Sequence, residues 1–204
     1  EIYRQIDEQQ CTAIDNIFCW HGNTDLIIAI IKLMEDKLNA ESDIIDGGVQ
    51  AILLVEDSVR FYSTYLPELY KILLVQNSEF LKDAYNEQQQ ISRKRARPKV
   101  LLATNYNDAI NIYNRYKKNL LGVISDVGLI INAGDKAEDE RSDAGIEICK
   151  MIKAETPWMP VIMQSSQVNL RSVAESLGAG FIAKTSKTLL QELQELQAMS
   201  RSSI

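Results

Sequence analysis

The amino-acid sequence predicts an α/β fold, in which parallel strands alternate with helices that cover both faces of a single sheet. From residue 49 onward, a short apolar run is followed by a segment with helical spacing of apolar residues, five times over. The apolar runs show little polar alternation, which is typical of strands buried on both faces. Charged or reactive side chains follow several runs, at the sheet edge where open α/β proteins build their sites.

The composition is that of an ordinary globular protein. Of 204 residues, 46% are hydrophobic and 25% charged, enough for one large domain. A formal net charge of -6 argues against a nucleic-acid partner, which needs clustered cations. Cys11, Cys19 and Cys149 form no CxxC pair, and the longest apolar run is too short for a membrane span. We therefore expect a cytoplasmic protein without membrane contact. Because the chain does not begin with Met, we also expect it to be a piece of a longer protein.

Residues 1–48 precede the repeated pattern and are expected to form a separate unit. Residues 17–20 are interpreted as a short strand and residues 24–39 as an amphipathic helix, with a boundary at Gly47–Gly48. An isolated strand and helix would expose apolar surface. The helix should therefore pack on the long first helix of the next domain or on another copy of the chain. The side chains that need such a partner are Leu26, Ile30 and Met34.

The remaining elements follow in order. The predicted strands cover residues 49–55, 99–104, 120–124, 161–163 and 180–184. The predicted helices cover residues 59–97, 106–118, 143–154, 169–177 and 188–199, with Gly178 ending the fourth. Pro67 should kink or restart the first of these helices. Its basic end, residues 93–97, is interpreted as a solvated helix terminus in preference to a nucleic-acid patch. The charged loop 129–142 is expected to be solvated and mobile.

Five polar side chains stand at the carboxyl ends of the predicted strands and should meet in one shallow pocket. They are Glu56, Asp57, Asp126, Ser165 and Lys184. Three carboxylates and one lysine carry a net charge of about -2, which should raise the pKa of at least one acid. Mg²⁺ would relieve this repulsion, and a carboxylate can attack phosphorus to form an acyl phosphate. The lysine and the hydroxyl would stabilise the transferred group. Taken alone, an aspartate after a strand is equally well explained as a turn residue.

Four motifs in this order resemble the receiver domain of bacterial response regulators over residues 49–197. They are VEDS (55–58), SDVG (125–128), PVIMQSS (160–166) and GAGFIAKTS (178–186). The resemblance implies a flavodoxin-like, doubly wound five-stranded parallel sheet of order 2-1-3-4-5. It also implies that Asp126 is the phosphoacceptor, that Lys184 binds the phosphoryl group, and that Ser165 and Phe181 form the switch. The implied ligands of Mg²⁺ or Mn²⁺ are Glu56, Asp57, Asp126 and the Gly128 carbonyl.

By the same resemblance, the chain would take a phosphoryl group from a histidine kinase or phosphotransfer protein of a two-component phosphorelay. It would then switch an attached or partner domain, and would not itself be an enzyme beyond self-phosphorylation and slow self-dephosphorylation. The chain departs from the family in Thr185, where proline is usual, in Ser166, and in its long first helix and long loop after Asp126. The two lengthened parts resemble receivers in the N-terminal region of multidomain proteins related to phosphoenolpyruvate synthase, where a kinase-type enzyme domain follows.

This resemblance gives the N-terminal unit an interpretation. Residues 1–48 look like the last strand and helix of a preceding, degenerate receiver, with Trp20 standing where Lys184 stands in the second. Residues 49–197 would be the receiver and residues 198–204 a tail. A homodimer through helix 24–39 and the long first helix would be one way to cover the apolar surface.

Two other readings remain open. A pseudo-receiver, which keeps the fold as an interaction or dimerisation module without phosphorylation, is favoured by Thr185 and the long first helix. A phosphatase of the haloacid dehalogenase type also uses an aspartyl phosphate. That class normally has a second aspartate two residues after the nucleophile, where this chain has Gly128.

Overall fold

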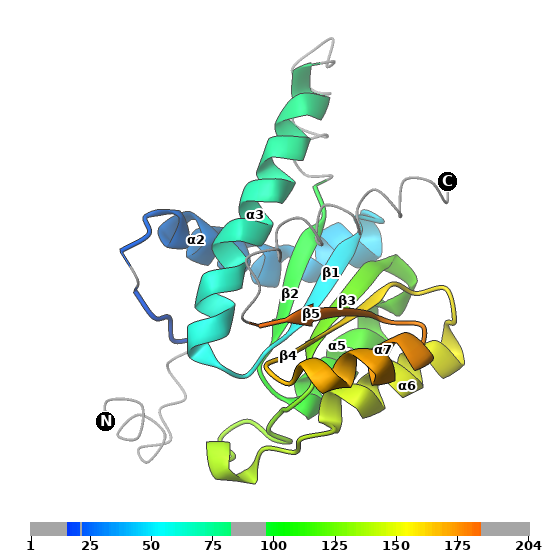
Figure 1. The fold of residues 1–204 in the computed structure, drawn as a ribbon. Coiled ribbons are helices and arrows are strands. Elements are labelled where there is room, and N and C mark those ends of the chain that lie inside the picture. The colour runs from blue at the N-terminus through cyan, green and yellow to red at the C-terminus, as the bar shows by residue number, and fades with distance from the viewer. Residues whose placement is uncertain (1–15, 21, 83–96, 185–204) are drawn as a thin grey trace.

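A single five-stranded parallel sheet forms the centre of the molecule (Figure 1). The computed structural model describes residues 16–20, 22–82 and 97–184. Its strands are β1 (Ala51–Val55), β2 (Lys99–Ala103), β3 (Leu120–Asp126), β4 (Val161–Ser165) and β5 (Gly180–Ala183). They lie side by side in the order β2-β1-β3-β4-β5, and every pair is parallel. The predicted flavodoxin-like topology is confirmed.

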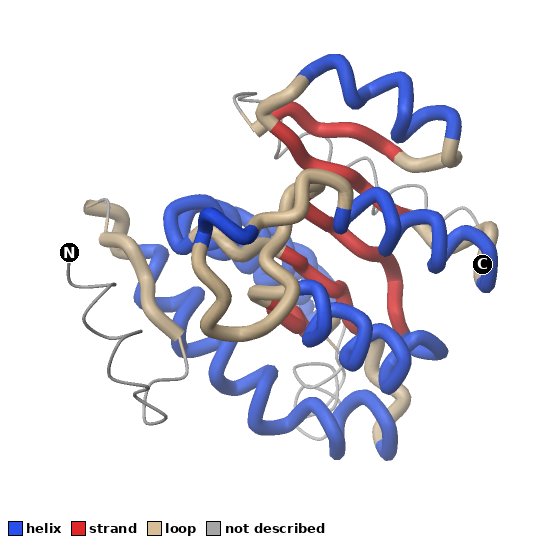
Figure 2. Tube along the Cα trace, turned by 90° about the horizontal axis from the view of Figure 1, so that it is seen from below, coloured by secondary structure: helices blue, strands red, loops and turns tan. Residues whose placement is uncertain are grey.

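Helices cover both faces of this sheet (Figure 2). The α-helices are α2 (Asp25–Ala40), α3 (Val59–Lys82), α5 (Tyr106–Tyr116), α6 (Ala144–Glu155) and α7 (Arg171–Ser176). A π-helical turn, η1 (Glu41–Asp46), continues α2, and three 3₁₀ turns are η2 (Lys117–Asn119), η3 (Ala137–Asp139) and η4 (Val168–Leu170). Helices α2 and α3 pack on one face, and α5, α6 and α7 on the other. None of the helices in the described part of the chain is long and apolar enough to cross a membrane.

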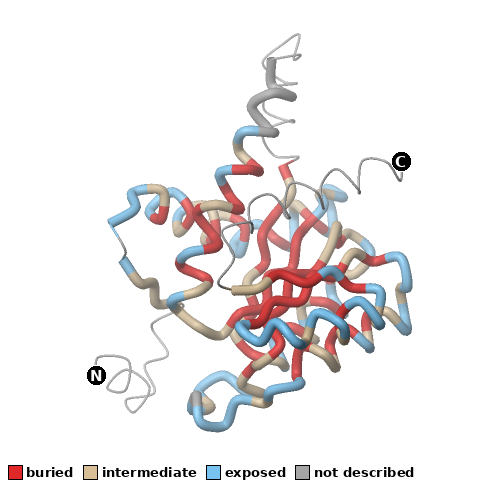
Figure 3. The backbone as a smooth tube through the Cα atoms, in the orientation of Figure 1, coloured by how far each residue is buried: buried red, intermediate tan, exposed pale blue. Residues whose placement is uncertain are grey.

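The apolar strand residues divide between two cores because successive side chains of a strand point to opposite faces. In β1, Leu53 and Val55 belong to the core under α5 and α6, and Ile52 and Leu54 to the core under α2 and α3. All five residues of β1 are buried (Figure 3). Burial on both faces explains why the strands read as apolar runs without alternation.

Several predicted element ends are confirmed and others are not. Gly178 has a φ of 68° and follows α7, as expected of a helix stop. Helix α3 runs through Pro67 as one element, so the helix does not restart there, and the alternative, a kink at Pro67, stays a prediction. The loop 129–142 is not simply solvated, since Leu129 is fully buried and pairs with Arg141 in an antiparallel bridge. The predicted helix 188–199, residues 83–96 of the long helix, and Thr185 lie outside the described residues.

The segment 17–20 forms no strand, which corrects that prediction. Its backbone is instead held by side chains of α3: Cys19 N–H donates to Ser63 Oγ at 2.9 Å, and the Tyr62 hydroxyl donates to Ile17 O. Phe18 packs edge-on against Tyr62, with ring centroids 5.7 Å apart. These contacts attach the segment to α3, and its origin as part of a preceding receiver stays a prediction.

Helix α2 packs on α3 and on the edge strand β2 of the same chain. Packing on the long first helix was one of the two expected arrangements, and it is confirmed. Leu26, Ala29 and Leu33 are buried there, while Ile27 and Ile31 remain about half exposed. The alternative partner, a second copy of the chain, stays a prediction.

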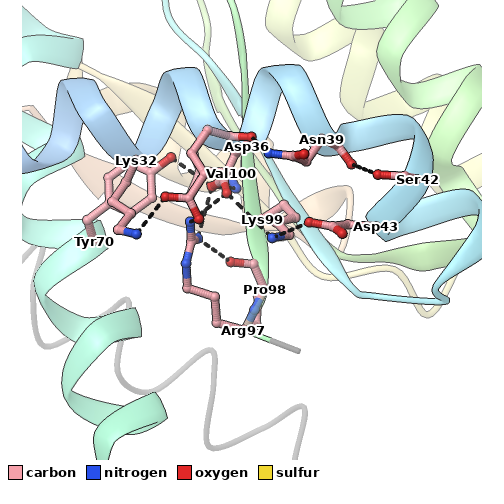
Figure 4. Close-up of polar contacts among 11 residues, drawn as sticks. Lys32, Asp36, Asn39, Ser42, Asp43, Tyr70, Arg97, Pro98, Lys99 and Val100 are labelled. Carbon is pink, nitrogen blue, oxygen red and sulfur yellow. Dashed lines mark hydrogen bonds and ion pairs between the residues drawn. The ribbon is translucent and has the colours of Figure 1, made fainter. Parts of the chain in front are cut away.

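A fully buried carboxylate, Asp36, fixes α2 to the sheet (Figure 4). Its Oδ1 lies 2.6 Å from Arg97 Nη2, and its Oδ2 accepts hydrogen bonds from Arg97 Nη1 at 3.0 Å and the Tyr70 hydroxyl at 2.9 Å. Oδ2 also accepts from the N–H of Val100 at 2.9 Å. Because β2 is an edge strand, this N–H has no neighbouring strand to pair with. Asp36 thus satisfies an outward-facing amide of the edge strand.

The same network corrects the interpretation of the basic run 93–97. Arg97 is only 3% exposed and pairs with Asp36, so it is neither a solvated helix end nor part of a nucleic-acid surface. Residues 93–96 lie outside the described residues.

Replacing Asp36 by alanine should lower the free energy of unfolding by about 3–5 kcal/mol, because it leaves a buried guanidinium without its counter-charge. The matched control is Glu41→Gln in the π-helical turn that continues α2. The Glu41 side chain is 58% exposed, and its ion pair with Arg115 should contribute less than about 1 kcal/mol. Urea unfolding followed by circular dichroism measures both. Equal losses in the two variants would contradict the role given to Asp36.

Candidate functional site

The carboxyl ends of four neighbouring strands meet at one edge of the sheet. In the pairing register, Val55 of β1 lies opposite Ser125 of β3, and Ser165 of β4 lies opposite Ala183 of β5. Glu56 and Asp57 follow β1 directly, Asp126 ends β3, and Lys184 follows β5. Parallel pairing therefore places three acids and a lysine at one edge, as the sequence predicts.

Lys184 joins two of these acids across the sheet. Its Nζ lies 3.0 Å from Oε1 and 2.9 Å from Oε2 of Glu56, and it pairs with Oδ2 of Asp126. Glu56 is fully buried, and Asp126 is 7% exposed. Lys184 is separated in the sequence by 58 positions from Asp126 and by 128 positions from Glu56, and the three residues form one ion-paired cluster. The predicted meeting of the lysine with these acids is confirmed.

Backbone amides hold the remaining carboxylate oxygens. The Val127 N–H donates to Oδ1 of Asp126 at 2.7 Å, and the Ile130 N–H donates to Oδ2 of Asp57 at 2.9 Å. The Ser58 N–H donates to Oε1 of Glu56 at 3.2 Å. Glycine at residue 145 lets the first turn of α6 approach, since a Cβ there would overlap the carbonyl oxygen of Asp126. The loop after β3 and the start of α6 therefore position Asp126.

The pKa of all three carboxyl groups is raised. The sequence predicts a raised pKa from repulsion between the acids, and the structure shows that burial is the larger cause. For Glu56, burial is the main cause and the Asp126 carboxylate adds to it, so the pKa rises to about 8 although Lys184 opposes the shift. Burial raises the pKa of Asp57 against the hydrogen bond from Ile130, and that of Asp126 against the charge of Lys184. Burial disfavours the charged form of Lys184, but Glu56 and Asp126 together outweigh it and raise its pKa.

The three acids fit a divalent cation with oxygen ligands. One carboxylate oxygen from each of Glu56, Asp57 and Asp126 lies within 4.8 Å of the others. Oε2 of the buried Glu56 lies 2.9 Å from Lys184 Nζ, an ion pair without hydrogen-bond geometry. Three crowded carboxylates beside one ammonium group carry a net negative charge, which a divalent cation would balance.

The predicted switch residues lie close to this edge and are packed inward. Ser165 is 7% exposed, and its Oγ accepts a hydrogen bond from the Gln167 N–H at 3.1 Å. The carbonyl of Ser165 accepts from the Lys184 N–H at 3.0 Å, which ties the end of β5 to β4. Phe181 is 5% exposed and lies under the guanidinium of Arg171, 5.2 Å from the ring centroid. The hydroxyl oxygen of Ser165 is thus hydrogen-bonded to the backbone of the loop that follows β4. Its contact with a phosphoryl group stays a prediction.

Sequence reasoning missed an aromatic neighbour of the lysine. The ring centroid of Phe61 lies 4.2 Å from Lys184 Nζ, within cation–π range, and Phe61 stacks on Tyr65 at 6.0 Å. Tyr65 is buried, and its pKa is raised by burial and by the charges of Glu56 and Asp126. The sequence shows that the two aromatic residues are one helical turn apart, just after the acidic pair, and therefore share a helix face, but it does not show that this face meets the lysine.

Comparisons with known proteins give structural likeness only. No family model and no curated protein matches the chain. A receiver domain protein from Clostridium thermocellum is 19% identical, with a TM-score of 0.44, over 76% of this chain and all of that one. The receiver domain of NtrX from Brucella abortus is 20% identical (TM-score 0.43; 75% and 99% covered). TrrA from Thermotoga maritima, solved with Mg²⁺ and BeF, is 16% identical (TM-score 0.41; 74% and 99% covered). Sequence identities and TM-scores this low do not identify a family. A function for this chain has to be inferred from the residues of the pocket.

Without divalent cations, the pocket should make the protein less stable as the pH rises from about 5 to about 8.5. The pKa of Glu56 is higher in the folded state, about 8, than its ordinary value of 4.5, so folding favours the protonated carboxyl. That contribution is complete below the ordinary value and is lost as the pH rises through the folded one. Urea unfolding in the presence of a chelator, at several pH values, measures it.

In the Glu56→Gln variant, the side chain stays uncharged and the decline with pH should be shallower. Glu175→Gln, an exposed substitution on α7, is the control and should leave the decline unchanged. Parallel pH profiles for wild type and Glu56→Gln would refute this assignment.

Proposed function

We propose that the chain is a phosphoacceptor receiver domain in which Asp126 takes a phosphoryl group. The observation that carries the proposal is the ion-paired cluster of Asp126, Lys184 and Glu56, with Asp57 beside it, at the carboxyl edge of the sheet. A nucleophilic carboxylate, a cation for the transferred group and a set of cation ligands are the parts that such a transfer needs.

In the transfer, a carboxylate oxygen of Asp126 forms a bond to phosphorus as the bond between phosphorus and the donor breaks. The donor group, a histidine nitrogen or the acetate of acetyl phosphate, leaves with the electron pair of that bond. Lys184, already paired with Oδ2 of Asp126, is placed to neutralise charge on the incoming group. The Val127 N–H keeps the carboxylate oriented through Oδ1.

The residues that would hold Mg²⁺ or Mn²⁺ are Glu56, Asp57, Asp126 and the carbonyl of Gly128. When bound there, the cation supplies positive charge that screens the carboxylates from an approaching phosphoryl group. Oδ2 of Asp57 accepts a hydrogen bond from the Ile130 N–H. This bond orients the carboxylate and leaves Oδ1 to bind the cation.

Phosphorylation would change the conformation of Ser165 and Phe181, which lie on the neighbouring strands β4 and β5. Added charge at Asp126 would bias these two residues between two arrangements. The phosphodonor would be a histidine kinase or phosphotransfer protein, and the target a domain attached to or bound by this one. A target related to phosphoenolpyruvate synthase is supported by the resemblance of the long first helix and the long loop after Asp126.

A second candidate is a pseudo-receiver that keeps the fold but is not phosphorylated. One observation favours it: Lys184 already neutralises part of the acidic charge by pairing with both Glu56 and Asp126. Such a domain would act by binding a partner or a second copy, for which the half-exposed side chains Ile27 and Ile31 on α2 offer apolar area.

Incubation with acetyl phosphate and Mg²⁺, followed by intact mass measurement, distinguishes the two candidates. We expect one added phosphoryl group on the wild-type chain and none on Asp126→Asn, because the amide is not a nucleophile. Asp135→Asn, in the loop outside the pocket, is the matched control and should be phosphorylated like wild type. A folded wild-type chain that gains no phosphoryl group would favour the pseudo-receiver.

A further inference from the structure

A fourth carboxylate lies against the pocket, and it comes from the loop between β3 and α6. Leu129 N lies 3.1 Å from Arg141 O, and Arg141 N lies 2.9 Å from Leu129 O. This bridge folds the loop back on itself and brings Glu140 against Gly128. Arg141 is held in turn by Asp143 and Glu147 at the start of α6, at 3.0 and 2.8 Å. The position of Glu140 is therefore set by backbone pairing and by an ion-paired neighbour.

Gly128 supplies the space that Glu140 occupies. A Cβ at residue 128 would overlap Oε1 of Glu140 and would lie 2.9 Å from its Cδ. Gly128 is not among the glycines with positive φ, so its backbone conformation is open to other residues. Glycine at this position leaves room for the Glu140 carboxylate, and a larger residue would move that flexible side chain away.

Glu140 shares the electrostatic environment of the pocket. Burial raises the pKa of Glu140, the charges of Asp57 and Asp126 raise it further, and Lys184 opposes the shift. Glu140 itself remains exposed, at the rim. Farther inside, Oε2 of the fully buried Glu56 lies 2.9 Å from Lys184 Nζ without hydrogen-bond geometry. Four carboxylates thus act electrostatically on one another around a single ammonium group, and Glu140 is the exposed one.

We propose that Glu140 is a positioning residue of the cation site, which acts on a divalent cation held by Glu56, Asp57 and Asp126. The inference rests on the proposed function, since it takes that pocket to be a cation site. Mg²⁺ keeps several of its waters when bound to proteins. A carboxylate at the rim accepts hydrogen bonds from such waters and adds to the field that attracts the cation. Glu140 thereby raises the affinity for the cation without binding it directly.

Calorimetric titration of the unphosphorylated chain with MgCl₂ tests this role. Glu140→Gln should weaken Mg²⁺ binding about fivefold at low ionic strength, as expected on removing one partly exposed charge near a divalent ion. Glu138→Gln, two residues earlier in the same loop, is the matched control and should change the affinity less than about twofold.

Gly128→Ala provides a second, independent test, because the added methyl group displaces the Glu140 carboxylate. It should weaken Mg²⁺ binding to a similar extent. The double variant Gly128→Ala/Glu140→Gln should bind no more weakly than either single variant, since both changes remove the same interaction. Unfolding midpoints measured in chelator verify that the variants fold. Because the carbonyl of Gly128 is itself an implied ligand, the double variant assigns the loss to Glu140, and Glu140→Ala, which removes the same charge, replaces Glu140→Gln if that variant does not fold.

The outcomes separate this inference from the function on which it rests. Wild-type affinity in Glu140→Gln, or fully additive losses in the double variant, would overturn the role of Glu140 while leaving the receiver in place. If neither the wild-type chain nor any variant binds Mg²⁺, the cation site of the proposed function fails, and the role of Glu140 fails with it. Loss of binding in Asp57→Asn together with a fivefold loss in Glu140→Gln would support both.

Discussion

The ion pairs of Lys184 with Glu56 and Asp126 are the interaction around which the functional edge of the molecule is arranged. The lysine follows the last described strand, and its partners are Glu56, which follows the first strand, and Asp126, which ends the third. Opposite charges in a buried setting attract strongly only when their geometry is good, and a buried carboxylate without its partner is costly. The cluster therefore stabilises one relative placement of β1, β3 and β5. The cost of burial that remains is visible in the raised pKa of Glu56.

A second ion-paired cluster performs the same task at the opposite side of the sheet. Asp36 joins α2, α3 and β2 through Arg97, Tyr70 and the N–H of Val100. The two clusters differ in one respect that bears on function. Asp36 meets a guanidinium, a hydroxyl and a backbone N–H, whereas Glu56 and Asp126 share one ammonium group and lie close to Asp57. The functional edge therefore carries more negative than positive charge, which favours a cation.

The topology and most of the pocket could be predicted from the sequence because both depend on local patterns. Apolar runs identify buried strands, and parallel pairing alone determines that Asp57, Asp126 and Lys184 reach the same edge. Glu140 and Phe61 could not be placed in this way. Glu140 reaches the pocket through a bridge within a loop, and no periodicity reports loop pairing. Phe61 lies on a helix, where the face that an aromatic residue presents depends on packing.

The errors at the N-terminal side have a common cause. The segment 17–20 has the composition of a strand, but two of its backbone groups bind side chains of α3, Ser63 and Tyr62, and no neighbouring strand. Arg97 ends a basic run that reads as solvated, yet its charge is met by Asp36, far away in sequence. In both cases a long-range partner overrides the local pattern.

The closure of the β2 edge by α2 has a practical consequence for how the domain can be isolated. The glycine pair at residues 47–48 suggests a convenient place to begin an expressed fragment. A fragment cut there would lose Ala29 and Leu33 from one of the two cores, and would leave a buried guanidinium and an edge amide uncovered. Recombinant versions intended for biochemistry or crystallisation should therefore start upstream of α2, at or before residue 16.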